Sequence, residues 1–532
     1  MKAPKLKLLL TLVLLGIFYS LIGFSQTTST ATNSSTAHKF YCVDARELGN
    51  PQKLQLASLQ AIVNENSPVL FTIWDKEDLS WLKAMEKELG ANCEQISVDD
   101  ALARLGANAR QVLYDPKQFW GITVATTVAG VNHAILTEWD LHRKTAFDCR
   151  NLWTSKAEAY RWALTELLPQ CDHSQLAYLN EELFAIRDYA IQKKLFVLSL
   201  DPLNDPQDIE LLNETLAKFP AQTRVFGWAT GDYARKEMGQ SPVAVEDALV
   251  SRLSSRGMML IPSDFAANLS FYDQTAPYIG KLTQQHLDRD IQFQAGKRYV
   301  LLVNSDGDNV QFDLRGMRQE WEAFQKERPN IPRIPVAWTI SPSLVDVAPA
   351  VLQIYYQEAT AAGGLDEFVA GASGYAYVNP GSMSGVNLNG FVHLTQRACE
   401  QADISSIVIL DNGGRPPAQV AYFINAYATA NFNGLWLAAM PRYVGAMKGT
   451  AFLSERIRIG DKTGGEVAQD VKTQDIKSNG IDYPFFMIYG GITPEFLRDF
   501  RNNLDGSCVV VSPTEMADLI RQWNVSLNDG SR

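Results

Sequence analysis

Short apolar runs alternate with stretches of helical apolar spacing along the first half of the chain. Residues 54–64 have apolar positions at helical spacing, and residues 69–74 form a mostly apolar run typical of a buried strand. The same alternation continues to residue 285. Alternating strands and helices indicate parallel or mixed sheets. We therefore predict three small α/β domains, over residues 39–105, 106–172 and 173–285.

The alternation becomes more regular in the last part of the chain. Seven apolar runs, separated by segments with helical spacing, fit parallel strands over roughly the length that a barrel needs. The predicted strands are residues 299–303, 336–340, 368–370, 407–410, 435–438, 485–489 and 509–511. We predict that residues 290–528 form a (β/α) barrel-like domain, so that the fold class of the chain is α/β.

The N-terminus has the pattern of an export signal. Lysines precede the apolar run of residues 8–19, and small residues follow it. This run is shorter than the about 20 residues of a membrane-spanning helix. We predict a signal peptide over residues 1–26 and, from its Ser, Thr, Ala and Asn content, a disordered linker over residues 27–38. The mature protein would be exported, periplasmic or extracellular, with no stable membrane span.

Composition excludes several classes of partner and site. The 532 residues carry a net charge of -11 at a pI of about 5.2, which argues against a nucleic-acid partner. Six cysteines without a C-x-x-C pair exclude a zinc ribbon and a dense disulfide scaffold. Cys149 and Cys171 are nearest to each other in sequence and could form a disulfide, and isolated buried thiols are the alternative.

The first predicted barrel strand combines a buried run with a polar end. Residues 299–303 are continuously apolar, and residues 304–309 hold two carboxylates, two carboxamides, a hydroxyl and a glycine. In α/β barrels, functional side chains lie at the carboxyl ends of the strands. We therefore expect Asp306 and Asp308 to be catalytic and Asn309 to bind substrate.

Other predicted barrel strands also end in polar or aromatic residues, which would converge on the same rim. Asp411 follows the strand of residues 407–410 and is the third carboxylate candidate for catalysis, although a turn-forming role explains it equally well. The remaining candidates for substrate binding are Trp338, Ser373, Tyr375, Tyr377, Asn412 and Arg415.

Carboxylates beside aromatic rings supply what cleavage of a glycosidic bond needs. One carboxylic acid protonates the leaving oxygen, a second carboxylate activates water or attacks carbon, and rings hold the sugar. The sequence motifs that several other hydrolase reactions require are absent from the chain. The chain has no G-x-S-x-G elbow and no G-x-x-x-x-G-K-[ST] loop, and His393 is the only histidine after Lys297. By elimination, carboxylate chemistry is the best-supplied reaction.

The same acidic segment offers a metal-binding alternative. Asn304, Asp306 and Asp308 alternate as the first ligands of a calcium loop do. Asn309 stands where that loop needs glycine and Arg315 where it needs its distal glutamate, which excludes an EF-hand. A simpler divalent-cation site at Asp306 and Asp308 is the alternative to catalysis. We otherwise expect no metal and no cofactor.

Residues 371–380, with the sequence GASGYAYVNP, resemble the signature of the GxGYxYP putative glycoside hydrolases. Gly374, Tyr375 and Tyr377 keep the core of the signature. Ala372 replaces its first glycine and Val378 its proline. If the position of Ala372 required a positive φ, its β-carbon would alter the loop.

Further segments resemble the same family in order and spacing. Residues 305–309 and 335–342 are similar to its C-terminal domain, and residues 59–64, 226–228 and 268–270 are similar to its N-terminal domains. The resemblance implies small N-terminal domains ahead of a barrel-like domain, in exported bacterial proteins that handle sugars.

These observations lead to one expected function and two alternatives. We expect a glycoside hydrolase that cleaves the glycosidic bonds of an extracytoplasmic poly- or oligosaccharide by carboxylate acid–base chemistry. One alternative is a non-catalytic glycan-binding protein, in which the same rim binds sugar without cleaving it. The other is a cation-dependent hydrolase of another ester bond. The expected partner is a carbohydrate substrate.

Overall fold

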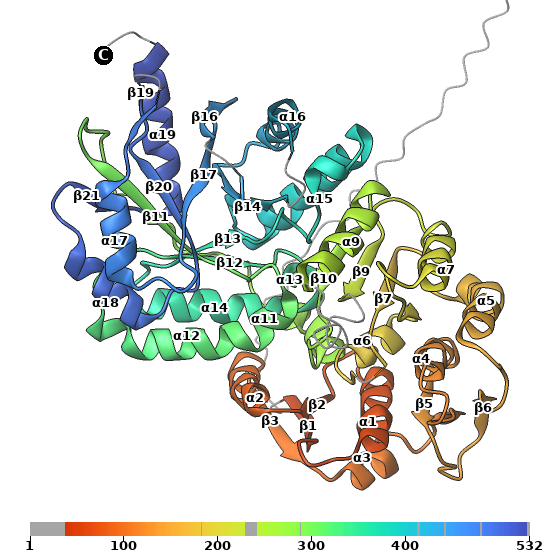
Figure 1. Cartoon of the computed structure of the whole chain (residues 1–532). Helices are drawn as coiled ribbons and strands as arrows, with labels where there is room; N and C mark the ends of the chain where they lie inside the picture. The colour runs from red at the N-terminus through yellow and green to blue at the C-terminus, as the bar shows by residue number, and fades with distance from the viewer. Residues whose placement is uncertain are drawn as a thin grey trace, which may run out of the picture. The chain divides into compact units, whose positions relative to one another are not determined.

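The computed structural model (Figure 1) describes residues 38–181, 183–228, 242–287, 289–411, 415–440, 443–478 and 481–528. The predicted signal peptide, residues 27–37 of the predicted linker, and Asn412 lie outside this part of the chain. Among the described residues, no helix has the length and apolar character needed to cross a membrane.

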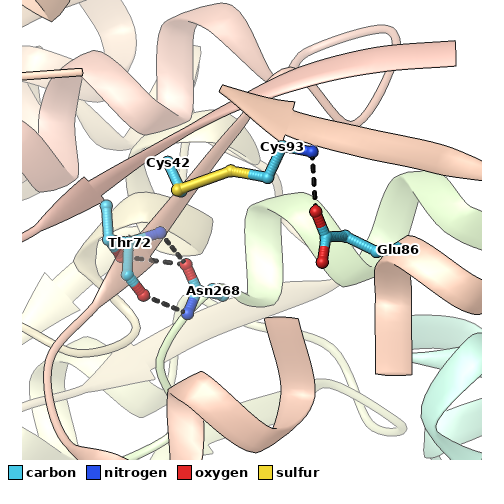
Figure 2. Close-up of a disulfide and its surroundings, with 5 residues drawn as sticks. All are labelled: Cys42, Thr72, Glu86, Cys93 and Asn268. Atoms are coloured by element: carbon cyan, nitrogen blue, oxygen red, sulfur yellow. Dashed lines mark hydrogen bonds between the residues drawn. A yellow bond between two sulfur atoms is a disulfide. The ribbon is translucent and has the colours of Figure 1, made fainter. Parts of the chain in front are cut away.

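The first sheet is parallel, has the strand order β2-β1-β3, and contains a disulfide. Its strands are β1 (His38–Asp44), β2 (Leu70–Ile73) and β3 (Ala91–Gln95), accompanied by the helices α1 (Asn50–Val63), α2 (Lys76–Glu88) and α3 (Val98–Arg104). Cys42 of β1 bonds to Cys93 of the neighbouring strand β3 (Figure 2). Cys149 and Cys171 are buried free thiols instead, which was the alternative expectation for them.

Two further parallel sheets follow, with the orders β5-β4-β6 and β10-β9-β7-β8. The strands are β4 (Arg110–Leu113), β5 (Ala134–Thr137), β6 (Thr145–Asp148), β7 (Gln175–Tyr178), β8 (Phe196–Leu198), β9 (Arg224–Gly227) and β10 (Met259–Pro262). The helices of this region are α4 (Gly121–Asn132), α5 (Lys156–Glu166), α6 (Arg187–Gln192), α7 (Pro206–Leu216), α9 (Pro242–Ser255) and, after β10, α10 (Leu269–Tyr272). In the third sheet a helix carries the chain back between each pair of successive strands, and in the second sheet α4 does so between β4 and β5, whereas the segment between β5 and β6 has no helix.

Asn268, which precedes α10, joins the third sheet's region to the first sheet. Its side-chain oxygen accepts hydrogen bonds from the backbone N–H and the hydroxyl of Thr72, both at 2.8 Å (Figure 2). Its side-chain nitrogen donates to the Thr72 carbonyl, also at 2.8 Å. Because β2 is an edge strand, the buried amide of Asn268 satisfies backbone groups that a neighbouring strand would otherwise pair.

The last sheet is a closed barrel of seven parallel strands. Its strands, in order around the ring, are β11 (Arg298–Asn304), β12 (Ala337–Ile340), β13 (Glu367–Ala370), β14 (Ser406–Leu410), β15 (Gly434–Ala438), β17 (Thr450–Arg458) and β20 (Phe485–Gly490). β11 pairs with both β12 and β20, which closes the ring. The predicted (β/α) barrel-like domain is therefore confirmed.

The identity of one barrel strand differs from the prediction. The predicted strand at residues 509–511 corresponds to β21 (Cys508–Val510), which pairs with the first residues of β11 and lies outside the ring. The missing barrel strand is β17, which the apolar pattern did not predict. Its sequence, TAFLSERIR, mixes polar with apolar residues because several of its side chains are only partly buried.

The barrel strands are buried on both faces. Tyr299, Leu301 and Val303 belong to an apolar cluster to which all seven strands contribute, so this cluster fills the barrel interior. Val300 and Leu302 belong to a second cluster, formed with the surrounding helices. Burial on both faces explains why the sequence of β11 is continuously apolar rather than alternating.

Helices surround the barrel (Figure 1). They are α11 (Val310–Leu314), α12 (Gly316–Glu327), α13 (Leu344–Val347), α14 (Pro349–Ala361), α15 (Gly385–Ala402), α16 (Pro417–Ala428), α17 (Gly464–Thr473), α18 (Pro494–Asn503) and α19 (Pro513–Asn528). The short strand β16 (Val444–Met447) pairs with β17 in antiparallel fashion, and β18 (Lys477–Ser478) pairs with β19 (Ile481–Asp482) in the same way.

The disulfide between β1 and β3 closes a loop across a sequence separation of 51 residues. Replacing both Cys42 and Cys93 by serine should lower the free energy of unfolding by about 2–4 kcal/mol, because the unfolded chain regains the freedom that the cross-link removes. Urea unfolding of the oxidised wild type and the double variant measures the difference. Adding a reductant should destabilise the wild type and leave the double variant unchanged. Equal stability of the oxidised wild type and the variant would contradict this role.

Candidate functional site

A cavity of about 510 Å³ opens at the carboxyl ends of the barrel strands, next to the third sheet. The loops after the barrel strands and the ends of β14 and β20 contribute Asp306, Asp308, Asn309, Tyr377, Leu410 and Tyr489. The helices after β11 add Gln311, Phe312, Arg315 and Gly316, and the region of the third sheet adds Trp228, Glu246 and Phe265. The barrel and the third sheet's region therefore build the cavity together.

The loop after β11 turns sharply before it reaches the cavity. Asp306 is exposed and has a left-handed backbone with φ of 74°. The N–H of Gly307 donates to the hydroxyl of Thr339 at 2.9 Å, and a β-carbon at this position would overlap the Thr339 carbonyl. Only glycine fits at residue 307, and this close contact between loop and β12 places the half-buried side chain of Asp308 in the cavity.

A second glycine, at the end of β13, packs against the same loop. A β-carbon added to Gly371 would lie 2.5 Å from the backbone nitrogen and the α-carbon of Asp308. Gly371 is the first residue of the signature segment, residues 371–380, so this segment begins in direct contact with Asp308. The next residue, Ala372, does not have a positive φ, so its β-carbon requires no altered backbone there.

Asp308 is the carboxyl group of the cavity whose environment favours the protonated form. Burial raises its pKa to about 7, and the negative charges of Asp306 and Glu246 act in the same direction. Burial and the charges of Asp308 and Asp306 also raise the pKa of Tyr489, which keeps its phenol neutral. Asp308 can therefore hold a proton near neutral pH and give it up to a bound molecule.

Aromatic and acidic side chains line the cavity on the side of the third sheet. The ring of Trp228 stacks on that of Tyr377, with centroids 6.4 Å apart and an interplanar angle of 21°. The Tyr377 hydroxyl donates to Oε1 of Glu246 at 2.7 Å. The Tyr377 ring is buried and the Trp228 ring is partly exposed, so the Trp228 ring beside carboxylates can bind the apolar face of a sugar.

Arg315 is the cationic residue of the lining, and its guanidinium is already engaged. It pairs with Asp75, and its Nε donates to the carbonyl of Phe265 at 2.6 Å. Burial lowers the pKa of Arg315 to about 10, which leaves it charged at neutral pH. Arg315, on the barrel side of the cavity wall, thus links the start of α2 and the loop after β10 to the barrel domain.

Of the residues predicted for the site, Asp306, Asp308, Asn309 and Tyr377 line the cavity. Trp338 does not, because its ring is buried among the helices, 5.0 Å from Trp321 and 5.1 Å from Phe324 between centroids. Strand position explains this placement: Ala337 faces the barrel interior, so the adjacent Trp338 faces outward.

Tyr375 and Ser373 are buried and bonded within the protein. The Tyr375 hydroxyl donates to Asp346 at 2.6 Å and accepts from Arg224 of β9 at 3.2 Å. Ser373 has a φ of 72°, and its hydroxyl donates to the carbonyl of Leu410 at 2.9 Å. Both side chains hold the signature segment in place and do not line the cavity.

The buried carboxylate of Asp411 forms an ion pair with the half-buried side chain of Arg415, and neither residue lines the cavity. Arg415 Nε donates to Asp411 Oδ1 at 2.8 Å, and the N–H of Gly381 donates to Asp411 Oδ2 at 2.6 Å. Arg415 also donates to the hydroxyl of Ser382 at 2.5 Å. The pair fastens the loop after β14 to the turn at residues 380–382, and these contacts are structural.

Sequence reasoning missed Glu246 as a site residue. It lies on α9, where nothing in the local pattern distinguishes it from an ordinary surface acid of an amphipathic helix. Only the fold brings it to the barrel.

In the part of the chain that the structure describes, no three His, Cys, Asp or Glu side chains form a group that could hold a metal ion.

Three domain models of one family match the chain. The model described as "GxGYxYP putative glycoside hydrolase C-terminal domain" matches residues 296–521. The "GxGYxYP third domain" matches residues 173–274, and the "GxGYxYP_N 1st domain" matches residues 39–105. Together these matches cover most of the chain. No curated protein sequence matches it.

Solved structures give an independent view of the fold. The crystal structure of "a putative hydrolase from Bacteroides thetaiotaomicron VPI-5482" has a TM-score of 0.76 and 19% sequence identity, and the likeness covers 91% of this chain and 95% of that chain. At this identity the likeness shows the fold alone. The 4-alpha-glucanotransferase from Thermococcus litoralis aligns at a TM-score of 0.29 and 10% identity over 42% of this chain and 40% of that chain, which is too low to bear on the fold.

The contact between Gly371 and Asp308 yields a prediction about stability. Gly371→Ala should lower the free energy of unfolding by about 1–3 kcal/mol, because the added methyl group must push two packed backbone segments apart. Denaturant unfolding measures the loss. Gly280→Ala is the matched control, since a β-carbon there would meet nothing within 4 Å. Similar stabilities of the two variants would show that the loops are not closely packed.

Proposed function

The chain belongs to the GxGYxYP family of putative glycoside hydrolases, and on this premise we propose that its cavity cleaves the glycosidic bonds of a poly- or oligosaccharide. The observation that supports the proposal most is the place of Asp308, half-buried in a cavity lined by aromatic rings and further carboxylates, where burial raises its pKa to about 7. Glycoside hydrolysis needs one carboxylic acid that stays protonated near neutral pH.

Asp308 is the proton donor in this proposal. It transfers its proton to the glycosidic oxygen while the bond from that oxygen to the anomeric carbon breaks, and the bonding electron pair stays on the oxygen. The oxygen of a water molecule forms the new bond to the anomeric carbon, directly or after a covalent intermediate, and the water releases one proton. The partly exposed ring of Trp228 offers a surface to the sugar, the nearly buried Tyr377 and Tyr489 close the cavity wall beside it, and Asn309 offers an amide to the sugar's hydroxyl groups. A glycan-binding protein would use the same rings but has no need of a protonated carboxyl group, so the raised pKa favours catalysis.

We also propose that the protein meets its substrate outside the cytoplasm. The predicted signal peptide is one support. The disulfide between Cys42 and Cys93 is another, because disulfides persist chiefly in oxidising compartments.

The pH dependence of the reaction follows from the state of Asp308. The protonated form is the active one, and it is lost as pH rises through a pKa of about 7. The kcat/KM of the wild type should therefore fall tenfold per pH unit above about pH 7. The rate of reducing-end release from the polysaccharide that the wild type cleaves, measured between pH 4 and 10 at constant ionic strength, tests this. A rate that stays level up to pH 9 would exclude Asp308 as the donor.

Asp308→Asn should separate two classes of substrate. On the polysaccharide, kcat/KM should fall on the order of 10²–10⁴-fold, because no group protonates the leaving oxygen. On the 2,4-dinitrophenyl glycoside of the released sugar, whose leaving group needs no proton, most activity should remain. The surface variant Asp461→Asn is the control, since Asp461 is exposed and outside the cavity. An unchanged rate on the polysaccharide would remove Asp308 from the mechanism.

A further inference from the structure

We propose that Glu246 is the second catalytic carboxylate and that Tyr377 of the signature segment positions it. The active site would then be completed by helix α9, in the region of the third sheet, rather than by the barrel alone. This inference rests on the proposed glycoside hydrolase function and assigns a role to a residue that the barrel itself does not contain.

Glu246 and Asp308 line the same cavity but come from different parts of the fold. Asp308 lies on the loop after β11 of the barrel, and Glu246 lies on α9, which precedes β10 of the third sheet. Both side chains are half-buried. Two carboxylates that act on one glycosidic bond must flank it. Glu246, on a separate element, can face the bond from the side opposite to Asp308. Asp306 lies only two residues from Asp308 in the same loop and is therefore less suited to the opposite side.

Tyr377 fixes the orientation of the Glu246 carboxylate. Its hydroxyl donates to Oε1 at 2.7 Å, and its ring stacks on Trp228. Its backbone is held as well: the N–H of Tyr377 donates to the carbonyl of Leu260 at 2.8 Å, and the N–H of Leu260 donates back at 3.1 Å. This isolated bridge joins the signature segment to β10, so the hydroxyl has little freedom to move.

Asn379 fixes the helix that carries Glu246. Its side-chain nitrogen donates to Asp247 at 3.1 Å and to the Ser251 hydroxyl at 2.9 Å. Its backbone N–H donates to the Ser254 hydroxyl at 2.9 Å. These three partners follow each other at helical spacing, so the signature segment runs along one face of α9. The position of Glu246, one residue before Asp247, is thereby set against the barrel.

The two carboxyl groups are suited to different tasks. Asp308 favours its protonated form, and the charge of Glu246 is one cause of that preference. Glu246 Oε1 accepts a hydrogen bond from the Tyr377 phenol, and a hydrogen bond of this kind is stronger when the acceptor is an ionised carboxylate. An ionised Glu246 would face the positive charge that develops at the anomeric carbon when Asp308 protonates the leaving oxygen.

The variants Glu246→Gln and Asp306→Asn, assayed on both substrates, test the assignment. Glu246→Gln should lose at least about a hundredfold in kcat on the polysaccharide and also on the 2,4-dinitrophenyl glycoside. The reason is that the positive charge at the anomeric carbon must be stabilised whichever group leaves. This pattern differs from that of Asp308→Asn. Glu210→Gln, an exposed acid on α7, is the control and should retain full activity. Thermal melting checks that each variant is folded.

Two outcomes would overturn the inference in different ways. If Glu246→Gln stays within about threefold of the wild type while Asp306→Asn loses activity on both substrates, Asp306 is the second carboxylate and the proposed function stands. If the wild type releases no reducing ends from a broad polysaccharide panel, the proposed function fails together with the inference.

Tyr377→Phe tests the positioning role. The variant keeps the ring on Trp228 but removes the hydrogen bond to Glu246, so kcat should fall on the order of tenfold with KM within about twofold. The acidic limb of the pH profile should move to higher pH, because the carboxylate loses a donor. Tyr356→Phe, which removes a buried hydroxyl that donates to the Ala402 carbonyl at 2.6 Å, is the matched control. An unchanged acidic limb of the pH profile would show that Tyr377 contributes only packing and does not position Glu246.

Discussion

Close backbone packing at the mouth of the barrel determines where Asp308 lies, and the rest of the site depends on that position. Gly307 lies against the Thr339 carbonyl of β12, and Gly371 lies against the backbone of Asp308 itself. A side chain at either glycine would force the loops apart. Because the loops pack this closely, the side chain of Asp308 is half-buried and its pKa rises to about 7, whereas Asp306 in the same loop is exposed.

The barrel domain and the region of the third sheet both contribute residues to the lining of the cavity. Trp228 and Phe265 follow β9 and β10, so the carboxyl ends of that sheet and of the barrel strands meet at one place. The carboxyl ends of parallel strands are the usual location of ligand sites in both kinds of sheet. The isolated bridge between Leu260 and Tyr377 joins the two regions by backbone hydrogen bonds, which give a more fixed geometry than side-chain contacts alone.

The sequence pattern predicted the strands with continuous apolar runs and the polar end of β11, because burial on both faces and a carboxyl-terminal position leave clear local signals. It missed β17, whose side chains are partly polar, and it placed Trp338 at the mouth. A strand buried on both faces has no alternation to show which residues point inward. Glu246 carries no local signal at all, since its place in the cavity arises from contacts between α9 and a segment more than a hundred residues later in the chain.

The buried polar groups around the signature explain why its residues are mostly structural. A buried hydroxyl or carboxylate without a partner is costly, and Tyr375, Ser373 and Asp411 each bond within the protein. Gly374 has a φ of 130°, and a β-carbon there would lie 2.5 Å from the Thr395 side chain, so this glycine cannot be exchanged freely. Ala372 does not adopt a positive φ and replaces a glycine without backbone strain. The signature residues therefore serve mainly to hold the segment in its course between the barrel and α9. This course places Tyr377 in the cavity lining, where its hydroxyl bonds to Glu246.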